Sequence, residues 1–237
     1  MALCSADFEK GTQGSTPAIG DLGSATAWDV VVTETNSTII YDNTHAHGAR
    51  AAKFVTVTGS PCHSYLVWST ALGTVTDHYG RLYIYPTDLS AIHYFIGPTQ
   101  ASFTPATYND TGLTLTSTGA IELRDSAATV QATTTTVVPL NDWSRIEYHF
   151  VHSTTVGSVE VKMFVGANAE GTVPDETKTA SSINTNTNAS YLMIGNGNNA
   201  ATLTFWLDDI IAGASSYPGP VTTASAPFIP RRMPMGV

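Results

Sequence analysis

Residues 143–151 read Trp-Ser-Arg-Ile-Glu-Tyr-His-Phe-Val. Apolar and polar side chains alternate along this stretch: Ile146, Tyr148 and Phe150 against Arg145, Glu147 and His149. Because successive side chains of a strand point to opposite faces, this pattern predicts a β-strand with one buried and one solvated face. Residues 159–165 repeat the pattern, and the inward positions expected there are Val159, Val161, Met163 and Val165. Such alternation is typical of antiparallel sheets that cover a core on one side.

The composition of the 237 residues favours strands along the whole chain. Thr makes up about one residue in seven, Val and Ile are frequent, and Leu, Glu and Lys are scarce. The frequent types prefer strands, and the scarce types prefer helices. Hydrophobic residues make up 42% of the chain and charged residues only 12%, which argues against disorder. We therefore expect an all-β protein, and a sandwich of this length is commonly one domain.

Alternating segments bounded by Gly, Pro and Asn follow one another at the spacing of a β-sandwich. The expected strands are 28–35, 51–58, 64–69, 81–85, 91–96, 113–116, 121–125, 129–138, 143–151, 159–165, 191–194 and 202–211. About a dozen strands are too many for a seven-stranded immunoglobulin-type domain and suit a two-sheet antiparallel jelly-roll sandwich. Residues 195–199, Gly-Asn-Gly-Asn-Asn, predict a hairpin turn between the last two strands.

The charge balance limits the kinds of partner that the protein is expected to bind. The chain has 10 Lys and Arg against 19 Asp and Glu, a formal net charge of −9. Phosphate surfaces repel such a protein, so neither nucleic acid nor a membrane is expected as a partner. The first residues show no charged segment followed by an apolar stretch, and no apolar run has membrane-spanning length. We expect a protein made in a cytoplasm without a secretion signal.

The last residues differ in composition from the rest. Five prolines within 217–237 are incompatible with a central strand or a helix. We therefore expect residues 1–216 to form the sandwich domain and residues 217–237 an extended arm, the alternative being a disordered tail. The arm carries two arginines and no acidic residue. The side chains expected to bind a neighbouring subunit or another protein are Phe228, Ile229, Arg231, Arg232, Met233 and Met235.

Five segments, in order, carry a resemblance to a known family. They are Asp7–Thr12, His47–Phe54, Pro139–Glu147, Trp206–Gly213 and Tyr217–Pro220. Over roughly residues 5–220, the chain resembles the concanavalin A-like, laminin-G-like jelly-roll domains found in virion proteins of tailed bacteriophages that infect actinobacteria. The resemblance implies two packed antiparallel sheets and a role on the tail or the head surface of a virion. Its implied partners are other virion proteins and copies of itself.

Paired carboxylates for glycoside hydrolysis are missing. The glucanases of this superfamily carry E-x-D-x-x-E on one strand, and this chain has no such motif. Glu122 and Asp125 come nearest, but their odd spacing points them to opposite faces. Glu147, between Arg145 and His149 on one face of its strand, is typical of a solvated charge ladder. We expect no enzyme activity.

Three acidic residues predict one structural calcium ion. In carbohydrate-binding modules with a similar sandwich, an acidic residue near the N-terminus and an Asp on the last strand often hold Ca²⁺. Here Glu9, Asp208 and Asp209 occupy the matching positions, and adjacent carboxylates in an apolar strand repel each other unless they are neutralised. In the alternative, Asp208 caps a turn and Glu9 is exposed. His45 and His47 are weak zinc candidates and are expected to form hydrogen bonds instead.

Glycan binding needs aromatic faces flanked by hydrogen-bonding groups on an exposed surface. Tyr83, Tyr85, Phe95 and Trp206 lie opposite apolar neighbours as a candidate platform, and Tyr83, Tyr85 and Trp206 are the candidate glycan-binding residues. The alternative places them in a second interior or at a subunit contact. The tryptophans expected to anchor the core are Trp28, Trp68 and Trp143, and the cysteines expected as buried thiols more than as a disulfide are Cys4 and Cys62.

Two functions follow from these observations. The first is a non-enzymatic virion structural protein, either a head-decoration or a minor tail component, anchored by its C-terminal arm. The second is a carbohydrate-binding module that recognises a cell-surface glycan. The two are compatible, because a virion protein can also hold the host.

Overall fold

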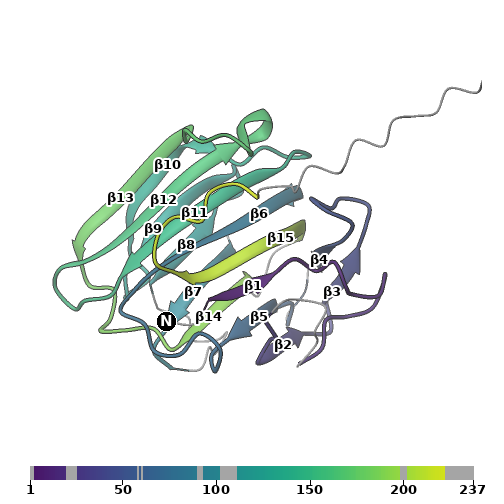
Figure 1. Ribbon diagram of the computed structural model, residues 1–237, viewed down its shortest axis with the longest axis horizontal. Helices are drawn as coiled ribbons and strands as arrows, with labels where there is room; N and C mark the ends of the chain where they lie inside the picture. The colour runs from purple at the N-terminus through teal and green to yellow at the C-terminus, as the bar shows by residue number, and fades with distance from the viewer. Residues whose placement is uncertain are drawn as a thin grey trace, which may run out of the picture.

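The chain forms two antiparallel β-sheets packed face to face, as the computed structural model in Figure 1 shows. The structure describes residues 3–19, 26–57, 59, 61–89, 93–101, 111–197 and 202–221. These residues form fifteen strands and a 3-10 turn at Gly166–Asn168. Within these ranges, no helix has the length and apolar character that a membrane crossing needs. The expected all-β class and the two-sheet antiparallel architecture are confirmed.

The larger sheet, called sheet A, has eight strands. In spatial order they are β13 (Glu176–Ile183), β12 (Gly157–Val165), β11 (Ser144–Val151), β6 (Asp77–Leu89), β15 (Leu203–Ala214), β4 (Ala51–Thr56) and β3 (Ser37–Asp42), with β1 (Cys4–Ala6) paired to the end of β15. Sheet B has seven, namely β10 (Val130–Val137), β9 (Ala120–Arg124), β8 (Gly112–Leu115), β7 (His93–Thr99), β14 (Tyr191–Asn196), β5 (Ser64–Trp68) and β2 (Val30–Thr33).

The core lies between the two sheets and follows the predicted alternation. Ile146, Tyr148 and Phe150 of β11 are fully buried in it. Strand β11 pairs with β6 and with β12, so their inward side chains form continuous rows across sheet A. Trp28 and Trp68 stack with ring centroids 4.0 Å apart, as expected of core anchors. Cys4 and Cys62 are both buried free thiols.

Three strands were not predicted: β1, β3 and β13. Strand β13 lies at the edge of sheet A, and most of its side chains are polar on both faces. Strand β3 places Ile39 and Ile40 side by side and so breaks the period of two. Neither sequence therefore carries the alternation from which a strand is read. Strand β6 is longer than expected because it continues on both sides of residues 81–85.

The predicted hairpin at residues 195–199 is wrong. Strand β14 belongs to sheet B and β15 to sheet A, so this segment crosses between the sheets. Gly195 lies within β14 with φ +130°, and a Cβ there would come within 2.6 Å of the Ser64 carbonyl oxygen. The glycine is therefore needed for close strand packing and not for a tight turn.

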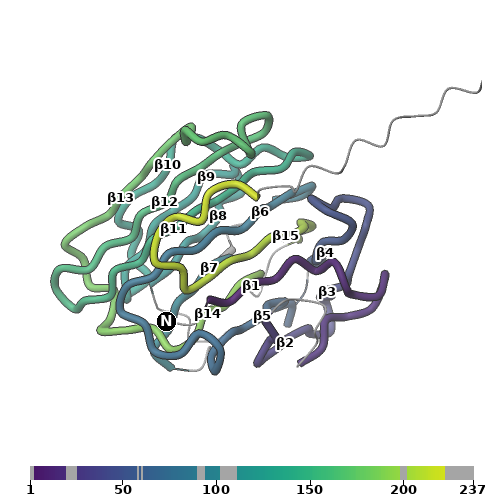
Figure 2. The backbone as a smooth tube through the Cα atoms, in the orientation of Figure 1, coloured from purple at the N-terminus to yellow at the C-terminus, as the bar shows by residue number. Residues whose placement is uncertain are grey.

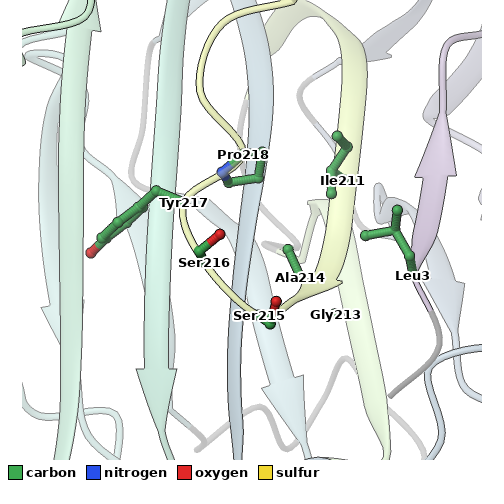
Figure 3. Close-up of a pocket in the computed structure, with 8 residues that line it drawn as sticks. All are labelled: Leu3, Ile211, Gly213, Ala214, Ser215, Ser216, Tyr217 and Pro218. Carbon is green, nitrogen blue, oxygen red and sulfur yellow. The ribbon is translucent and has the colours of Figure 1, made fainter.

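After β15 the chain turns back and crosses sheet A on the side away from the core. Figure 3 shows this turn, with Tyr217 pointing away from it toward neighbouring strands, and Figure 2 shows the chain passing over β6 and β11. A cavity of about 600 Å³ lies between the turn and Leu3. We call residues 215–221 the strap. Of the predicted arm, residues 217–221 thus lie against the sandwich, and the partner-binding residues Phe228, Ile229, Arg231, Arg232, Met233 and Met235 lie outside the described residues.

Candidate ligand-binding face of the larger sheet

The face of sheet A that points away from the core is covered by three segments instead of being open to water. Loop 43–50 stacks histidines on the tyrosines of β6. Loop 166–175 accepts hydrogen bonds from Arg145 of β11. The strap is held by Arg81, whose Nη1 donates to the Gly219 carbonyl at 2.8 Å, by Tyr83, whose hydroxyl accepts from the Val221 N–H at 3.1 Å, and by a hydrogen bond from Tyr217 to Glu160. We call this surface the outer face.

Six rings gather at one end of the outer face, and we call them the aromatic cluster. They are Tyr83, Tyr85, Trp143, Trp206, His45 and His47. His45 stacks on Tyr85 at 4.2 Å and His47 stacks on Tyr83 at 4.1 Å. Tyr85 meets Trp206 edge-on at 6.0 Å and Trp143 at 5.5 Å. Tyr83, Tyr85 and Trp206 are therefore brought together, whereas Phe95, also expected on this platform, is fully buried in the core between the sheets.

These three residues differ in accessibility. Tyr83 is fully buried and Trp206 is 4% exposed, while Tyr85 remains half-exposed. Trp206 is fixed by a hydrogen bond of 3.1 Å from its Nε1 to Asp42, and the Lys53 ammonium lies 4.8 Å from its ring centroid. Within the cluster, a ligand can reach Tyr85 and its half-exposed neighbours more readily than the other two predicted residues.

Trp143 is not a core anchor, as had been expected. It immediately precedes β11 and lies on the outer face, where it is half-exposed beside Tyr85 and His47. Its position in the alternating stretch gave the correct face, because it has the same parity as Arg145 and Glu147. Its large apolar ring led to the wrong prediction of burial in the core.

His47 links two of the covering segments to sheet A. Its Nδ1 lies 2.7 Å from the Asp209 carboxylate and its Nε2 lies 2.7 Å from the Glu170 carboxylate. Only the protonated imidazole donates from both nitrogens, and the hydrogen bond with Asp209 is the main cause that raises the pKa of His47, against a smaller opposing effect of burial. Tyr83 donates to the other oxygen of Glu170 at 3.0 Å. The rings and carboxylates of the outer face thus form one connected network.

The expected charge ladder on β11 is wrong for Arg145 and Glu147. Arg145 is fully buried and Glu147 is 2% exposed, with Nε and Oε1 at 3.3 Å. The Arg145 guanidinium donates to the carbonyls of Ala169 and Gly171, both at 2.7 Å. Burial raises the pKa of Glu147, and Arg145 opposes that rise. Loop 166–175 and the strap turn the polar face of the strand into a second interior, where the two charges neutralise each other.

Known structures share this architecture. No protein-family model matches the chain, and no curated protein sequence matches it. The structure titled "Cellulose induced protein, Cip1" aligns with a TM-score of 0.61 at 20% identity, over 91% of this chain and 98% of that one. A mutant of HCR/D aligns with a TM-score of 0.51 at 11% identity, over 92% of this chain and 49% of that one, so this chain spans about half its length. The lectin UEA-II, solved with galactose, aligns at 10% identity over 88% of this chain and 97% of that one, with a TM-score of 0.42.

The fold is a two-sheet antiparallel jelly-roll sandwich. At these identities the likeness defines the architecture and not the ligand. In this chain, loop 43–50, loop 166–175 and the strap lie over the outer face of the jelly roll.

The three residues predicted to hold calcium do not point to one position. Glu9 and Asp208 face backbone N–H groups of loop 43–50, and Asp209 faces the His47 ring. Glu9 accepts from the N–H groups of Ala49 and Arg50, and Asp208 accepts from the N–H of His47 at 2.9 Å. Asp209 has φ +46°, lies at an irregularity of β15 and turns its carboxylate to the His47 ring. Within the described part of the chain, no group of three or more His, Cys, Asp or Glu residues is arranged to hold a metal ion. Two carboxylates fall short of the six or more oxygens that calcium takes, so the calcium site stays a prediction.

The pH dependence of stability tests the calcium prediction. Burial, with Asp209 nearby, raises the pKa of Asp208 from 3.8 to about 8. Without metal, the folded state therefore keeps a proton that the unfolded state releases between those values, and the free energy of unfolding falls as the pH rises through this window. The expected loss is a few kcal/mol, because one pKa unit is worth about 1.4 kcal/mol, and Asp208→Asn should remove it.

Bound calcium would ionise Asp208 and abolish that decline. Thermal unfolding from pH 4 to pH 9, in EDTA and then in calcium, distinguishes the two cases. A rise in melting temperature with calcium that is lost in both Glu9→Ala and Asp208→Ala would support the metal. Identical unfolding curves in EDTA and in calcium would contradict the predicted calcium site.

Several residues of the outer face were missed by the sequence analysis. Glu170 belongs to no motif, and Tyr217–Pro220, although it is part of the family resemblance, gives no sign in the sequence of what it contacts. His47 forms the hydrogen bonds that were expected of it, with Asp209 and Glu170, whereas for His45 the structure shows ring contacts with Tyr85 and Trp206. Their stacking on Tyr85 and Tyr83 joins residues that are more than 30 positions apart in the sequence, so no local pattern predicts it.

Proposed function

We propose that the chain is a non-enzymatic glycan-binding protein and that its ligand packs on the half-exposed part of the aromatic cluster. The observation that carries this proposal is the grouping of Tyr85, Trp143 and His45 on an outer sheet face. Sugar rings present apolar C–H faces and polar edges, and aromatic rings with nearby hydrogen-bonding groups bind both.

Polar and charged groups surround these rings. Glu170, with a side chain 48% exposed, lies at one side through its contact with His47, and Lys53 lies at the other through its contact with Trp206. The fold of the lectin UEA-II, whose structure contains galactose, is of the same lectin-like class. Catalysis is not part of the proposal, because the buried carboxylate of Glu147 is paired with Arg145 instead of facing a second free carboxylate.

Tyr85→Ala is expected to weaken glycan binding about tenfold. An aromatic contact is worth roughly 0.5–1.5 kcal/mol beyond its burial, and 1.4 kcal/mol is a factor of ten in affinity. A glycan array followed by co-sedimentation with host cell wall measures the binding. Tyr79→Ala is the matched control, since Tyr79 is also half-exposed on the outer side of β6 but lies outside the cluster. Equal binding by wild type and Tyr85→Ala would contradict this site.

We also propose, as a second candidate function, that the protein is made in the host cytoplasm and assembled into a virion as a head-decoration or minor tail component. The observation that favours it is the strap, which contains Tyr217–Pro220 of the phage-type motif set and is tied to the outer face by Arg81, Tyr83 and Glu160. Residues 222–237 therefore continue from a fixed point. Their apolar and arginine side chains are proposed to bind other virion proteins or copies of the chain.

A truncation after Val221 tests the virion role. We expect the shortened protein to have the same melting temperature as the full-length chain, because the strap and its three hydrogen bonds to the outer face are retained. We also expect the shortened protein to be absent from purified virions. Protein gels of the particles, with the full-length chain as reference, give the copy number. Incorporation of the truncated chain at the level of the full-length chain would contradict the proposal that residues 222–237 anchor the protein in the virion.

A further inference from the structure

A second cavity lies on the outer face beneath the strap, and none of the six rings of the aromatic cluster lines it. Its volume is about 250 Å³, just below the roughly 300–1,000 Å³ of pockets that take drug-sized ligands. Its floor is formed by outward side chains of β11 and β12, and its walls by loop 166–175 and the strap. Six of the residues that line the cavity are Glu147, Lys162, Phe164, Pro174, Tyr217 and Pro220.

The floor of this cavity presents an acceptor and a donor side by side. Glu147 and Lys162 are directly opposite each other in the pairing of β11 with β12, which places their Cβ atoms roughly 5 Å apart. The Lys162 ammonium lies 3.6 Å from the Tyr217 ring centroid and has no carboxylate within ion-pair distance among the described residues. Glu147 is 2% exposed, and its Oε1 lies 3.3 Å from Arg145 Nε in the ion pair but forms no hydrogen bond of good geometry with any described residue.

The walls are apolar. Phe164 is 3% exposed, with the Arg145 guanidinium 3.7 Å from its ring centroid. Pro174 comes from loop 166–175, and Pro220 closes the cavity from the strap. A small ring compound with hydroxyls on its edge and C–H groups on its face matches such a lining.

We propose that this cavity is a carbohydrate subsite that takes one neutral pyranose unit, an inference that rests on the proposed glycan-binding function. One sugar hydroxyl donates to the Glu147 carboxylate and another accepts from the Lys162 ammonium, while the ring face packs on the prolines. An acidic sugar is disfavoured, because the carboxylate that Lys162 attracts would meet the Glu147 carboxylate across the strand pair. The strap gives this subsite its roof, so residues 217–220 are part of the site.

The test uses the full chain and a panel of single sugars. Saturation-transfer NMR and calorimetry would measure binding of glucose, galactose, mannose and N-acetylglucosamine, with glucuronic acid as the acidic arm. We expect saturable binding of at least one neutral sugar, with an affinity at least tenfold above that for glucuronic acid.

Two variants locate the binding without disturbing the buried ion pair. Lys162→Ala removes the donor, and Thr172→Phe, at an exposed loop position that lines the cavity, fills it. Each should lower the affinity at least tenfold. Lys178→Ala is the control, since Lys178 is a half-exposed lysine on the neighbouring strand β13 and should leave binding unchanged.

The outcomes separate the subsite from the proposed function. Loss of single-sugar binding in Tyr85→Ala, with wild-type affinity in Lys162→Ala and Thr172→Phe, would overturn the subsite and leave the glycan-binding function standing. Stronger binding of glucuronic acid than of every neutral sugar, or no saturable binding of any sugar in the panel, would also overturn it. If the glycan array is blank as well, both proposals fall.

Discussion

Arg145→Ala is expected to lower the free energy of unfolding by about 3–5 kcal/mol, the usual cost of removing one partner from a buried ion pair. The Arg145 guanidinium is fully buried, and it alone links Glu147 to the carbonyls of Ala169 and Gly171. Alanine removes the ion-pair partner of the buried Glu147 carboxylate, which keeps only the Gly219 N–H and the charges of Arg81 and Lys162, and leaves two carbonyls without their donor. Urea unfolding at neutral pH, with the midpoint and slope fitted separately, measures the loss.

A double variant provides the control for this prediction. Arg145→Met combined with Glu147→Leu removes both charges and keeps the volume, so most of the lost stability should return. A further expected result is faster proteolysis of loop 166–175 in Arg145→Ala, because that loop loses two hydrogen bonds. A loss below about 1 kcal/mol in Arg145→Ala would show that the pair behaves as an exposed one and would contradict the burial described for it.

His78→Phe is expected to make the protein resistant to acid. His78 lies inside the sandwich, fully buried, stacked on Phe150 at 5.5 Å, and neither ring nitrogen has a hydrogen-bond partner among the described residues. Burial, with smaller effects from His152 and His149, lowers its pKa from 6.5 to about 3. The unfolded chain therefore binds a proton between those values that the folded chain does not bind.

The sign of the effect follows from that proton. The contribution of His78 is fully present above pH 6.5 and is lost as the pH falls toward 3, by about 5 kcal/mol at about 1.4 kcal/mol per pKa unit. Phenylalanine has a similar shape and no proton to bind, so His78→Phe should flatten this part of the curve. Denaturant unfolding between pH 7 and pH 3 measures it, with the half-exposed His45→Phe as the control. An unchanged acid slope in His78→Phe would falsify the assignment.

The burial of His78 could not be predicted from its residue type. His78 and His152 lie with their ring centroids 5.5 Å apart, and His152 donates from Nδ1 to the Thr185 carbonyl at 2.7 Å, while its Nε2 has no hydrogen-bond partner among the described residues. In the sequence, His78 is one of seven histidines, and nothing in its neighbours distinguishes it from the half-exposed ones. Its burial follows from the pairing of β6 with β11, which places it opposite Phe150.

The strand pattern was predictable to a large extent because alternation is a local property. The residues of β11 and β12 that were expected inward are in the core, with Ile146, Phe150 and Val161 as examples. Edge and irregular strands escaped prediction, because β13 has polar residues on both faces and β3 has adjacent isoleucines. Residues 195–199 were read as a hairpin because Gly and Asn accept positive φ, but β14 and β15 belong to different sheets and do not pair.

The amino-acid order alone determined that the chain is all-β, which face of each regular strand enters the core, and that Tyr83, Tyr85 and Trp206 share the opposite face. These properties depend on side-chain spacing within a few residues, and the period of two transmits them directly. Only the tertiary structure decided that this opposite face is itself covered, because its covers, loop 43–50, loop 166–175 and the strap, come from distant parts of the chain. Burial of Arg145 and Glu147 and the accessibility of Tyr85 depend on those long-range contacts, which local spacing does not encode.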